Sequence, residues 1–570
     1  MPGIRRSYTE PFLNSFRILV VAEKMNIIVS FQMGTTKGKF NKWAGVAVVY
    51  LLLVTHCLAQ ISPSKQQTRR IDQPSVAGEI SGRYEGIGKT QSHGDVPIVM
   101  EIRSVKGTVT GTMHTPLGDF ELTQGSYTEG KLTLTVESYD DEGSITASLG
   151  DGKLVGELIG FGEKARLELK WTGPPGPPIR PTLSLSKEAW REDLQYLARE
   201  LPRSHKNAFH RVTLEQFEQA VVELDAKIPS LRESDIVMEM SRIVAMIGDG
   251  HTNLGWHGLF PRAPLRLFWF GKELRVTEAT AAYRRALGAR VVKIGNATVE
   301  EAYRRDQPYI SQGESEGFVL AVNAANMTYP AHLHGLGLAP DTTRALYTFE
   351  DDKGRKFSLD IKALAPGQPV ELLDAAKKKP LYRQKPDEPL WFTYLPNAQT
   401  LYFNFSGYPR RRAFGKFAQE LFDFIDRHPI KRVIVDMRQN GGGDFSRGRE
   451  FIISGFKQRP AINRRGQMFV IIGRVTYSAG MVNASDFRGE MYAILVGEPT
   501  GQRPNSYSEN RAFSLPNAHL SVSYSTQYYK VQEKDTPGII PDKRIDPDWT
   551  SYKGGRDPAL EWILAYPSDK

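Results

Sequence analysis

A proline-rich segment divides the chain into two parts with different patterns. Residues 172–178 read Thr-Gly-Pro-Pro-Gly-Pro-Pro. Such a run is stiff and extended, because proline restricts the backbone and has no N–H group for regular structure. We therefore predict a Pro-rich linker over residues 173–182 and separate folding on its two sides.

The part before the linker consists of short strand-like runs with turns between them. Glycines stand in most of the gaps, and the runs cover residues 97–103, 108–114, 131–137, 144–149 and 154–159. Regularly spaced short strands are typical of small antiparallel folds. Residues 77–172 are thus predicted to form a small all-β domain, an antiparallel β-sandwich or barrel.

The part after the linker divides into several regions. Residues 183–261 are expected to be helical, because apolar residues recur at helical spacing up to Gly248 and because Thr213 and Gln216 form a capping box. The rest is expected to be a mixed β region at 262–365, a polar linker at 366–390 and an α/β domain at 391–568. Alternating strands and helices in the last region predict a parallel sheet, so the expected fold class is multidomain α/β.

The first 59 residues have the layout of an export signal. Lysines precede an apolar run of 13 residues, Trp43–Thr55, and small residues precede a cleavage point after Ala59. We expect translation to begin at Met25 or Met33, and the protein to be exported, periplasmic or extracellular. An uncleaved membrane anchor is the alternative, but the run is short for a bilayer span of roughly 20 residues. No stable membrane span is therefore expected after cleavage.

Composition excludes several classes of function. The single cysteine, Cys57, excludes a disulfide framework and a cysteine-based zinc site. Removal of residues 1–59 takes away seven basic and two acidic residues, so the net charge falls from +10 to +5. No basic stripe interleaved with aromatic residues is present, and no nucleic-acid partner is expected.

A glycine triplet follows a strand in the α/β region. The apolar residues 433–435 run into Asp-Met-Arg-Gln-Asn-Gly-Gly-Gly-Asp at 436–444. Glycines permit backbone conformations that other residues avoid, which leaves N–H groups free to face a ligand. The segment is a candidate oxyanion or anion cradle, and a flexible loop without chemical use is the alternative.

A serine marks the next strand-to-helix turn. The strand at 468–472 leads to Val-Thr-Tyr-Ser-Ala-Gly at 475–480, and an apolar helix begins at once. A serine there lies near the positive end of the helix dipole, and the N–H group of Ala479 is available for an oxyanion. Ser478 is therefore a candidate nucleophile, although such a serine also suits an ordinary helix N-cap.

Histidines offer a candidate base. His251 lies in Gly-Asp-Gly-His-Thr at 248–252, where a glycine turn could hold it rigidly as a general base. The alternative is a turn histidine that bonds to nearby backbone. His332 and His334 form an H-x-H pair, but no third ligand pattern accompanies them, so a loop or strand pair is favoured over a metal site. Neither a metal nor a cofactor is predicted.

The ordered set of motifs resembles a known family. The sequences VIVDMRQNGGGD, VTYSAG, AILVGEPTGQ and GIIPD, in that order, resemble the tail-specific, C-terminal-processing and tricorn-core serine peptidases. The likeness covers roughly residues 420–565 and extends more weakly to about 185. It implies a crotonase-like α/β catalytic domain with an upstream helical domain. A PDZ-like insertion is the interpretation that it offers for residues 262–365.

The resemblance also implies the catalytic residues. In the processing branch a lysine beyond a G-x-x-T-x-G stretch is the base, but here Gln502 departs from that stretch and Arg503 stands at the lysine position. Arginine stays protonated and cannot serve as this base. In the tricorn-like branch the base is a histidine, and His251 matches it. Ser478 is then the nucleophile.

The remaining roles come from the same resemblance. Asp535 lies three residues before the G-x-x-P-D signature at 538–542 and fits best as the third, orienting member, with Glu533 as the close alternative. Ala479 and either Gly442 or Gly443 are the expected oxyanion donors. The predicted function is a serine-type peptidase that cleaves peptide or protein substrates through an acyl-enzyme. The alternative is a catalytically inactive peptide- or ligand-binding protein on the same fold. No oligomeric state is predicted.

Overall fold

The computed structural model describes residues 21–23, 26–28, 80–92, 94–115, 118–137, 142–161, 163–176 and 180–567. The chain divides into two compact units, Met1–Gln73 and Pro74–Lys570. In the first unit, β1 (Val21–Glu23) pairs antiparallel with β2 (Asn26–Ile28). The predicted export signal from Lys37 to Ala59 and both predicted start residues lie outside the described residues.

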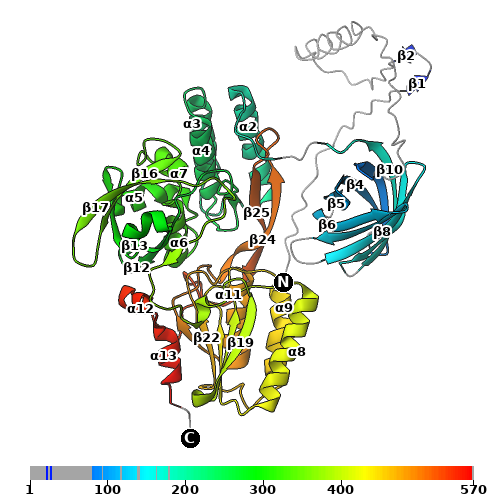
Figure 1. Ribbon diagram of the computed structural model, residues 1–570. Helices are drawn as coiled ribbons and strands as arrows, with labels where there is room; N and C mark the ends of the chain where they lie inside the picture. Colours follow the sequence, from blue (N-terminus) through cyan, green and yellow to red (C-terminus); the bar gives the residue numbers. More distant parts are fainter. Residues whose placement is uncertain are drawn as a thin grey trace, which may run out of the picture. The chain divides into compact units, whose positions relative to one another are not determined.

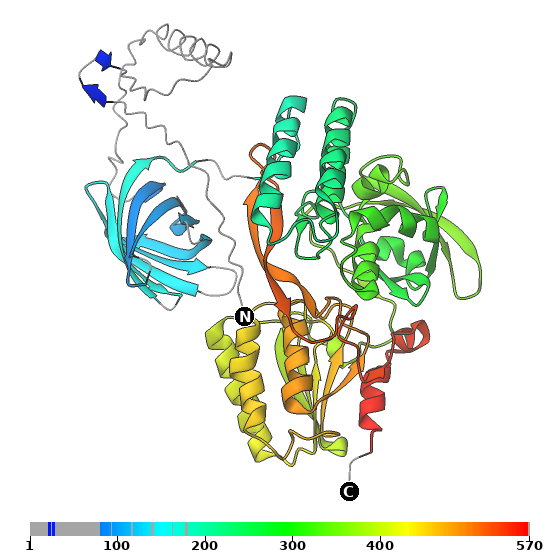
Figure 2. The same ribbon diagram turned by 180° about the vertical axis from the view of Figure 1, so that it is seen from behind.

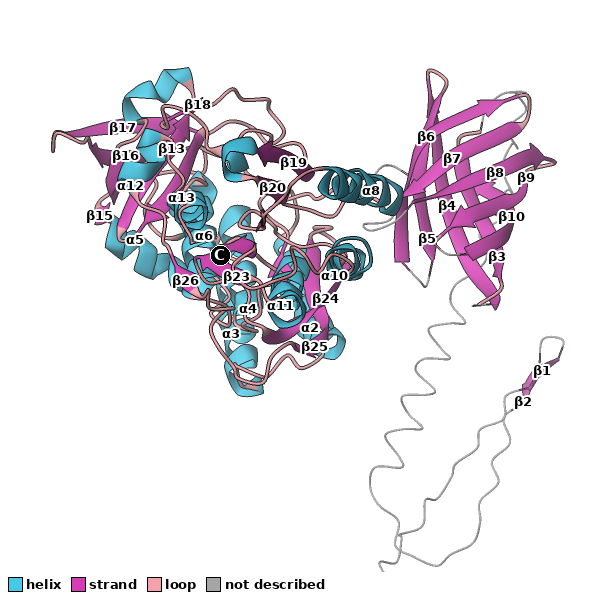
Figure 3. Cartoon of the chain, turned by 90° about the horizontal axis from the view of Figure 1, so that it is seen from below, coloured by secondary structure: helices cyan, strands magenta, loops and turns pink. Residues whose placement is uncertain are grey.

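The second unit begins with a closed barrel of eight strands, drawn entirely as strands in Figure 3. Each strand pairs antiparallel with its neighbours, in the order β10-β3-β4-β5-β6-β7-β8-β9. Alternate side chains point inward, as Leu132, Leu134 and Val136 do from β7, and they fill the interior. The predicted antiparallel domain is thus a barrel. Its strands β3 to β10 are Gly82–Thr90, Gly94–Val105, Thr108–Thr115, Gly118–Thr128, Lys131–Glu137, Glu142–Gly150, Lys153–Gly160 and Glu163–Gly173.

Three helices follow the linker, as predicted. They are α2 (Lys187–Ser204), α3 (Leu214–Lys227) and α4 (Glu233–Ala245). The predicted capping box is present at the start of α3, where the Thr213 hydroxyl accepts from the backbone of Gln216 and the Gln216 side chain accepts in return. Their apolar faces share one buried core.

A long two-stranded ribbon joins this helical core to the C-terminal region, as Figures 1 and 2 show from opposite sides. The ribbon consists of β24 (Asn505–Ser514) and β25 (Ser521–Lys530), and β25 also pairs with the short β11 (Asn253–Leu254). Leu515, Leu520 and Val522, at and near the tip of the ribbon, are buried in the helical core. The sequence gives no sign that residues from 391–568 complete the core of the helices.

The tip of the ribbon is held by one buried carboxylate. Asp193 on α2 is fully buried, and it accepts hydrogen bonds from the backbone N–H groups of Asn517 at 2.8 Å and Ala518 at 2.7 Å. The Asn517 side chain donates to the same carboxylate at 3.0 Å. A buried carboxylate needs such donors, because burial without them is costly.

Residues 262–374 contain an antiparallel sheet and three α-helices. The sheet order is β12-β13-β14-β16-β17, with β15 on β14 and β18 on β13. The strands expected of the predicted mixed β region are present, together with the three helices α5, α6 and α7. The strands β12 to β18 are Leu265–Phe270, Glu273–Ala279, Arg290–Ile294, Ala297–Thr298, Arg344–Glu350, Lys356–Lys362 and Leu373–Asp374, and the helices α5 to α7 are Val299–Asp306, Glu316–Asn326 and Pro330–Gly335.

The C-terminal region is built on a six-stranded sheet in the order β19-β20-β21-β22-β23-β26. Every neighbouring pair from β20 onward is parallel, which confirms the predicted β-α-β pattern. The central strands are buried on both faces, so they are almost continuously apolar. The strands are Leu390–Leu395, Thr400–Phe405, Arg432–Asp436, Met468–Ile472, Ile494–Gly497 and Lys543–Arg544, and the helices α8 to α13 are Arg411–Arg427, Phe445–Arg447, Ser454–Lys457, Ala479–Met491, Trp549–Gly554 and Pro558–Leu564.

Among the helices of the described ranges, none combines the length and the apolar character that a membrane span requires.

The buried carboxylate under the ribbon gives a stability prediction. Asp193→Ala should lower the free energy of unfolding by about 2–5 kcal/mol, because two buried N–H groups lose their acceptor. Asp225→Ala is the matched control, since Asp225 forms a partly exposed ion pair with Arg191 at 3.6 Å and should change stability by about 0–1 kcal/mol. Denaturant unfolding measures both, and equal effects would contradict the anchoring role of Asp193.

Candidate active site

Ser478 stands at the turn between β22 and α11, and its backbone is strained. Its φ of 50° and ψ of −125° lie where residues other than glycine rarely occur, at a typical cost of about 1–3 kcal/mol. Ser478 occupies the N-cap position of α11, but its side chain makes no capping hydrogen bond. The interpretation as an ordinary N-cap is therefore wrong, and the hydroxyl is left for another use.

The glycine loop after β21 lies directly against Ser478. A Cβ atom added to Gly442 would be 2.6 Å from the Cβ atom of Ser478, so no larger residue fits there. Gly442 and Gly443 have φ values of 115° and 150°, which confirms that the loop uses conformations other residues avoid. The two N–H groups differ. That of Gly442 donates to Asn440 Oδ1 at 3.0 Å, whereas that of Gly443 has no acceptor among the described residues.

Asn440 ties the glycine loop to the segment that carries Ser478. Its side-chain amide donates to the carbonyl of Phe405 at 2.9 Å, and its own carbonyl accepts from the N–H group of Tyr477 at 2.9 Å. The start of the loop is held by Arg438, whose half-buried guanidinium bridges the carboxylates of Asp436 and Asp557. The two loops are therefore held in a fixed relation to each other.

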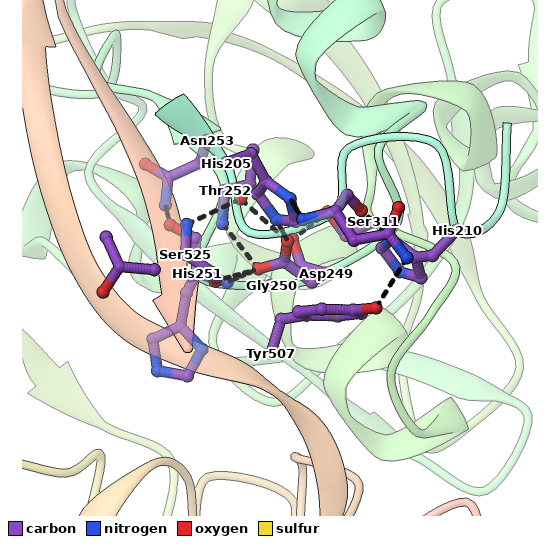
Figure 4. Close-up of polar contacts among 12 residues, drawn as sticks. His205, His210, Asp249, Gly250, His251, Thr252, Asn253, Ser311, Tyr507 and Ser525 are labelled. Carbon is purple, nitrogen blue, oxygen red and sulfur yellow. Dashed lines mark hydrogen bonds and ion pairs between the residues drawn. The ribbon is translucent and has the colours of Figure 1, made fainter. Parts of the chain in front are cut away.

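His251 lies in a different segment from Ser478, on a turn whose backbone is held by the Asp249 carboxylate. The Asp249 carboxylate accepts from the backbone N–H groups of His251 and Thr252, each at 3.0 Å. It also accepts from His205 Nε2 at 2.7 Å and from Ser525 Oγ, on the ribbon, at 2.8 Å, as Figure 4 shows. Burial alone would raise the pKa of Asp249, but the hydrogen bonds from His205, Thr252 and Ser525 outweigh it and lower the pKa.

The imidazole of His251 points away from this cluster (Figure 4). Its ring centre lies 4.9 Å from that of Tyr477, the residue before Ser478, and its Nε2 atom lies 3.4 Å from Ser508 Oγ. The Nδ1 atom is buried and has no hydrogen-bond partner in the described part of the chain. Burial lowers the pKa of His251, against the opposing influence of Asp249 and Glu509. The ring is therefore mainly unprotonated at neutral pH.

The other residues proposed from the sequence lie as follows. Ala479 is buried at the first position of α11, and its N–H group has no acceptor among the described residues. Asp535 is largely exposed and pairs with Arg503 at 2.8 Å, with no described contact to His251. Glu533 is exposed. The orienting role of Asp535 stays a prediction.

Two residues of this region were missed from the sequence. Gln502 Oε1 accepts from the N–H group of Ser478 at 2.5 Å, and its departure from the glycine of the family motif was the available signal. Glu314 has no motif. It is buried, and it accepts from the N–H group of Gly250 at 2.9 Å, from Tyr477 Oη at 3.0 Å and from the N–H group of Arg503 at 3.1 Å.

The H-x-H pair lies elsewhere in the molecule. It is on α7 and not on a loop or strand, and His332 Nε2 bonds to the buried Asp306 at 2.6 Å. In the described ranges, no group of three or more His, Cys, Asp or Glu side chains is placed to hold a metal ion.

The strained backbone at Ser478 gives a test that is independent of activity. Ser478→Gly should be more stable than Ser478→Ala by about 1 kcal/mol, because glycine adopts positive φ without the strain that alanine keeps. Both variants lack the hydroxyl, so the comparison isolates the backbone. Denaturant unfolding of the two variants measures the difference, and a more stable alanine variant would contradict the strain.

Comparison with known proteins gave matches among solved structures alone. No protein-family model and no curated relative matches the chain. Mature CPAF complexed with lactacystin is 10% identical, with a TM-score of 0.47, over 66% of this chain and 97% of that one. The photosystem II D1 C-terminal processing protease is 13% identical, with a TM-score of 0.32, over 65% and 98%. The tricorn protease is 12% identical, with a TM-score of 0.34, over 82% and 45%. These similar structures include a C-terminal processing protease and the tricorn protease, the peptidase groups that the sequence motifs resemble.

Proposed function

We propose that the chain is a serine-type peptidase in which Ser478 is the nucleophile and His251 the general base. One observation carries the proposal. A strained, non-capping serine lies against a glycine loop, and the residue before it contacts a buried imidazole whose pKa is lowered. Strained backbone and a shifted pKa in one place are typical of catalytic sites.

The reaction proceeds through an acyl-enzyme. His251 accepts the proton of the Ser478 hydroxyl while the oxygen attacks the carbonyl carbon of a peptide bond. His251 then gives that proton to the leaving amine, and the C–N bond breaks. A water molecule, deprotonated by His251, attacks the ester, and Ser478 leaves with the proton restored. The unprotonated state of His251 at neutral pH supports the first step.

The oxyanion is stabilised by backbone N–H groups that have no other acceptor. Ala479 and Gly443 meet this condition among the described residues, whereas the N–H group of Gly442 is already bonded to Asn440. We therefore favour Gly443 over Gly442 as the second donor. Preorganised donors of this kind contribute about 2.7–4 kcal/mol each to the transition state.

In this proposal, Asp535 affects the reaction only through Arg503. The ion pair of 2.8 Å holds the arginine side chain, and the backbone N–H group of the same arginine donates to Glu314. Its effect on the reaction is therefore indirect and small. The chain is proposed to be exported, to carry a crotonase-like catalytic domain with a PDZ-like region at 262–365, and to act on peptides or proteins.

A fluorophosphonate probe tests the nucleophile and the base. The Ser478 oxygen attacks the phosphorus and displaces fluoride, so the wild-type protein should be labelled. Ser478→Ala should abolish labelling, and His251→Ala should slow it by about 10²-fold or more, because general-base catalysis contributes about 10²–10⁴-fold. Asp535→Asn should slow it far less. Labelling rates followed by gel fluorescence give all four values.

The outcomes distinguish an active peptidase from a catalytically inactive binding protein on the same fold. An unlabelled wild-type protein that still binds peptides would favour a catalytically inactive binding protein. Labelling that persists in Ser478→Ala would show that another residue is the nucleophile.

The lowered pKa of His251 predicts the lower limit of the working pH range. The base must be unprotonated, so hydrolysis should persist at neutral pH and fall only below the ordinary histidine pKa of 6.5. Measurement of kcat/KM for a peptide substrate against pH tests this. Complete loss of activity above 6.5 would contradict a histidine base with a lowered pKa.

A further inference from the structure

A short segment of the middle region inserts between the segments that carry the site. Ser311 Oγ donates to the carbonyl of Asp249 at 2.8 Å, and the N–H group of Ser315 donates to the carbonyl of Gly501 at 3.2 Å. A Cβ atom added to Gly313 would lie 1.5 Å from the carbonyl oxygen of Gly248, so the two backbones touch. Residues 311–317 thus contact both the His251 turn and the loop at 500–503.

Within this segment, the side chain of Glu314 forms hydrogen bonds to the His251 turn, to the Ser478 turn and to the loop at 500–503. One carboxylate oxygen accepts from the N–H group of Gly250 and from Tyr477 Oη, and the other accepts from the N–H group of Arg503. Gly250 precedes His251, and Tyr477 precedes Ser478. Each hydrogen bond therefore ends one residue away from a group that the proposed reaction uses, or on the residue that replaces the lysine of the related peptidases.

The arrangement depends on the carboxylate form. An ionised carboxylate has acceptor positions for three donors, whereas a protonated carboxyl must direct its own O–H group at some acceptor. Two of the partners of Glu314 are N–H groups that can only donate, and the third, the Tyr477 hydroxyl, donates as placed, so a proton on the carboxyl reverses the bond to Tyr477 or weakens one of the others. Either change would loosen the connection between the two turns.

We propose that Glu314 is a positioning residue, which holds the His251 turn and the Ser478 turn at a working distance through its three hydrogen bonds. The proposal rests on the peptidase function inferred above and deepens it, because it names a third polar group that acts on both members of the pair. Residue positions that differ by about 1 Å can change a rate by about 10²-fold, so such a tie affects turnover.

The charges around Glu314 set its titration. Burial raises its pKa to about 7, while the hydrogen bonds from Gly250, Arg503 and Tyr477 act in the opposite direction. The titratable and charged groups that bond to it, act on its charge or line the same cavity are Asp249, His210, Arg211, Tyr477, Arg503, Tyr507, Tyr528 and Asp535. A cavity of about 290 Å³, lined by Glu314 with Arg211, Arg503 and Asp535, gives protons a route to the carboxylate.

The first experiment compares Glu314→Gln with Glu316→Gln, a matched change on an exposed residue two positions away. Above about pH 7, Glu314→Gln should lower kcat by about 10- to 100-fold with little change in KM, because glutamine offers one acceptor in place of two. The wild-type profile should rise further as pH passes about 7, and this rise should be absent from Glu314→Gln and kept in Glu316→Gln. A Glu314→Gln profile identical in shape and height to the wild type would overturn the proposal.

A double-mutant cycle identifies the hydrogen bond that matters. Tyr477→Phe removes the hydroxyl that donates to Glu314. If the two side chains act through this bond, the combined variant should lose clearly less than the product of the two single losses in kcat. Fully multiplicative losses would overturn the part of the proposal that runs through Tyr477.

A third measurement, of amide hydrogen exchange, does not need activity. Amide hydrogen exchange, followed by mass spectrometry, should accelerate in Glu314→Gln for peptides that contain Gly250 and Arg503, and stay unchanged in Glu316→Gln. Absence of hydrolysis and of probe labelling in the wild type would reject the peptidase function, while accelerated exchange would still support the tie between the two turns. Unchanged exchange at both amides would overturn the role of Glu314 whether or not the protein hydrolyses peptides.

The same substitution changes the pH dependence of folding. The folded state holds the Glu314 proton up to about pH 7, whereas an unperturbed glutamate releases it at about 4.5, so this group makes the folded protein less stable as pH rises between these values. The difference in unfolding free energy between wild type and Glu314→Gln should vary with pH in that window. A difference that stays constant there would contradict the raised pKa.

Discussion

The arrangement of the site depends on the β24–β25 ribbon and on the carboxylate that anchors it. The ribbon leaves the C-terminal region and ends in the core of the three helices, where Asp193 holds its tip. On the way it pairs with β11, two residues after His251, and Ser525 bonds to the Asp249 carboxylate that shapes the His251 turn. Without this ribbon the helices would lack part of their core, and the His251 turn would lose its contacts with Ser525 and β25.

Local geometry explains why position 478 holds a serine despite the backbone strain that a glycine would avoid. The Ser478 hydroxyl makes no capping bond with its own helix, and the Ser478 side chain lies against Gly442 of the glycine loop. Asn440 and Gln502 hold the backbone on both sides of this turn. The surrounding hydrogen bonds therefore keep a conformation that the isolated segment would avoid.

The parts that could be predicted from sequence are those specified locally. The capping box at Thr213, the apolar strands before Asp436 and Gly473, and the turns with Gly442 and Ser478 all follow from short patterns. The position of the ribbon tip and of Glu314 could not be read, because each depends on contacts between residues more than a hundred positions apart. Asp535 was proposed from its spacing in a motif, and the structure pairs its carboxylate with Arg503 on the surface, so its orienting role stays a prediction.

The order of these segments along the chain has a further consequence. Ser478 precedes the ribbon, and the ribbon is needed to complete the fold around His251, which was made more than 200 residues earlier. A chain growing from its amino terminus therefore contains both reactive side chains before it contains the strand that brings them to their final places. If they act as proposed, an unfinished molecule cannot cleave the proteins around it, and activity becomes possible only after the ribbon has been made.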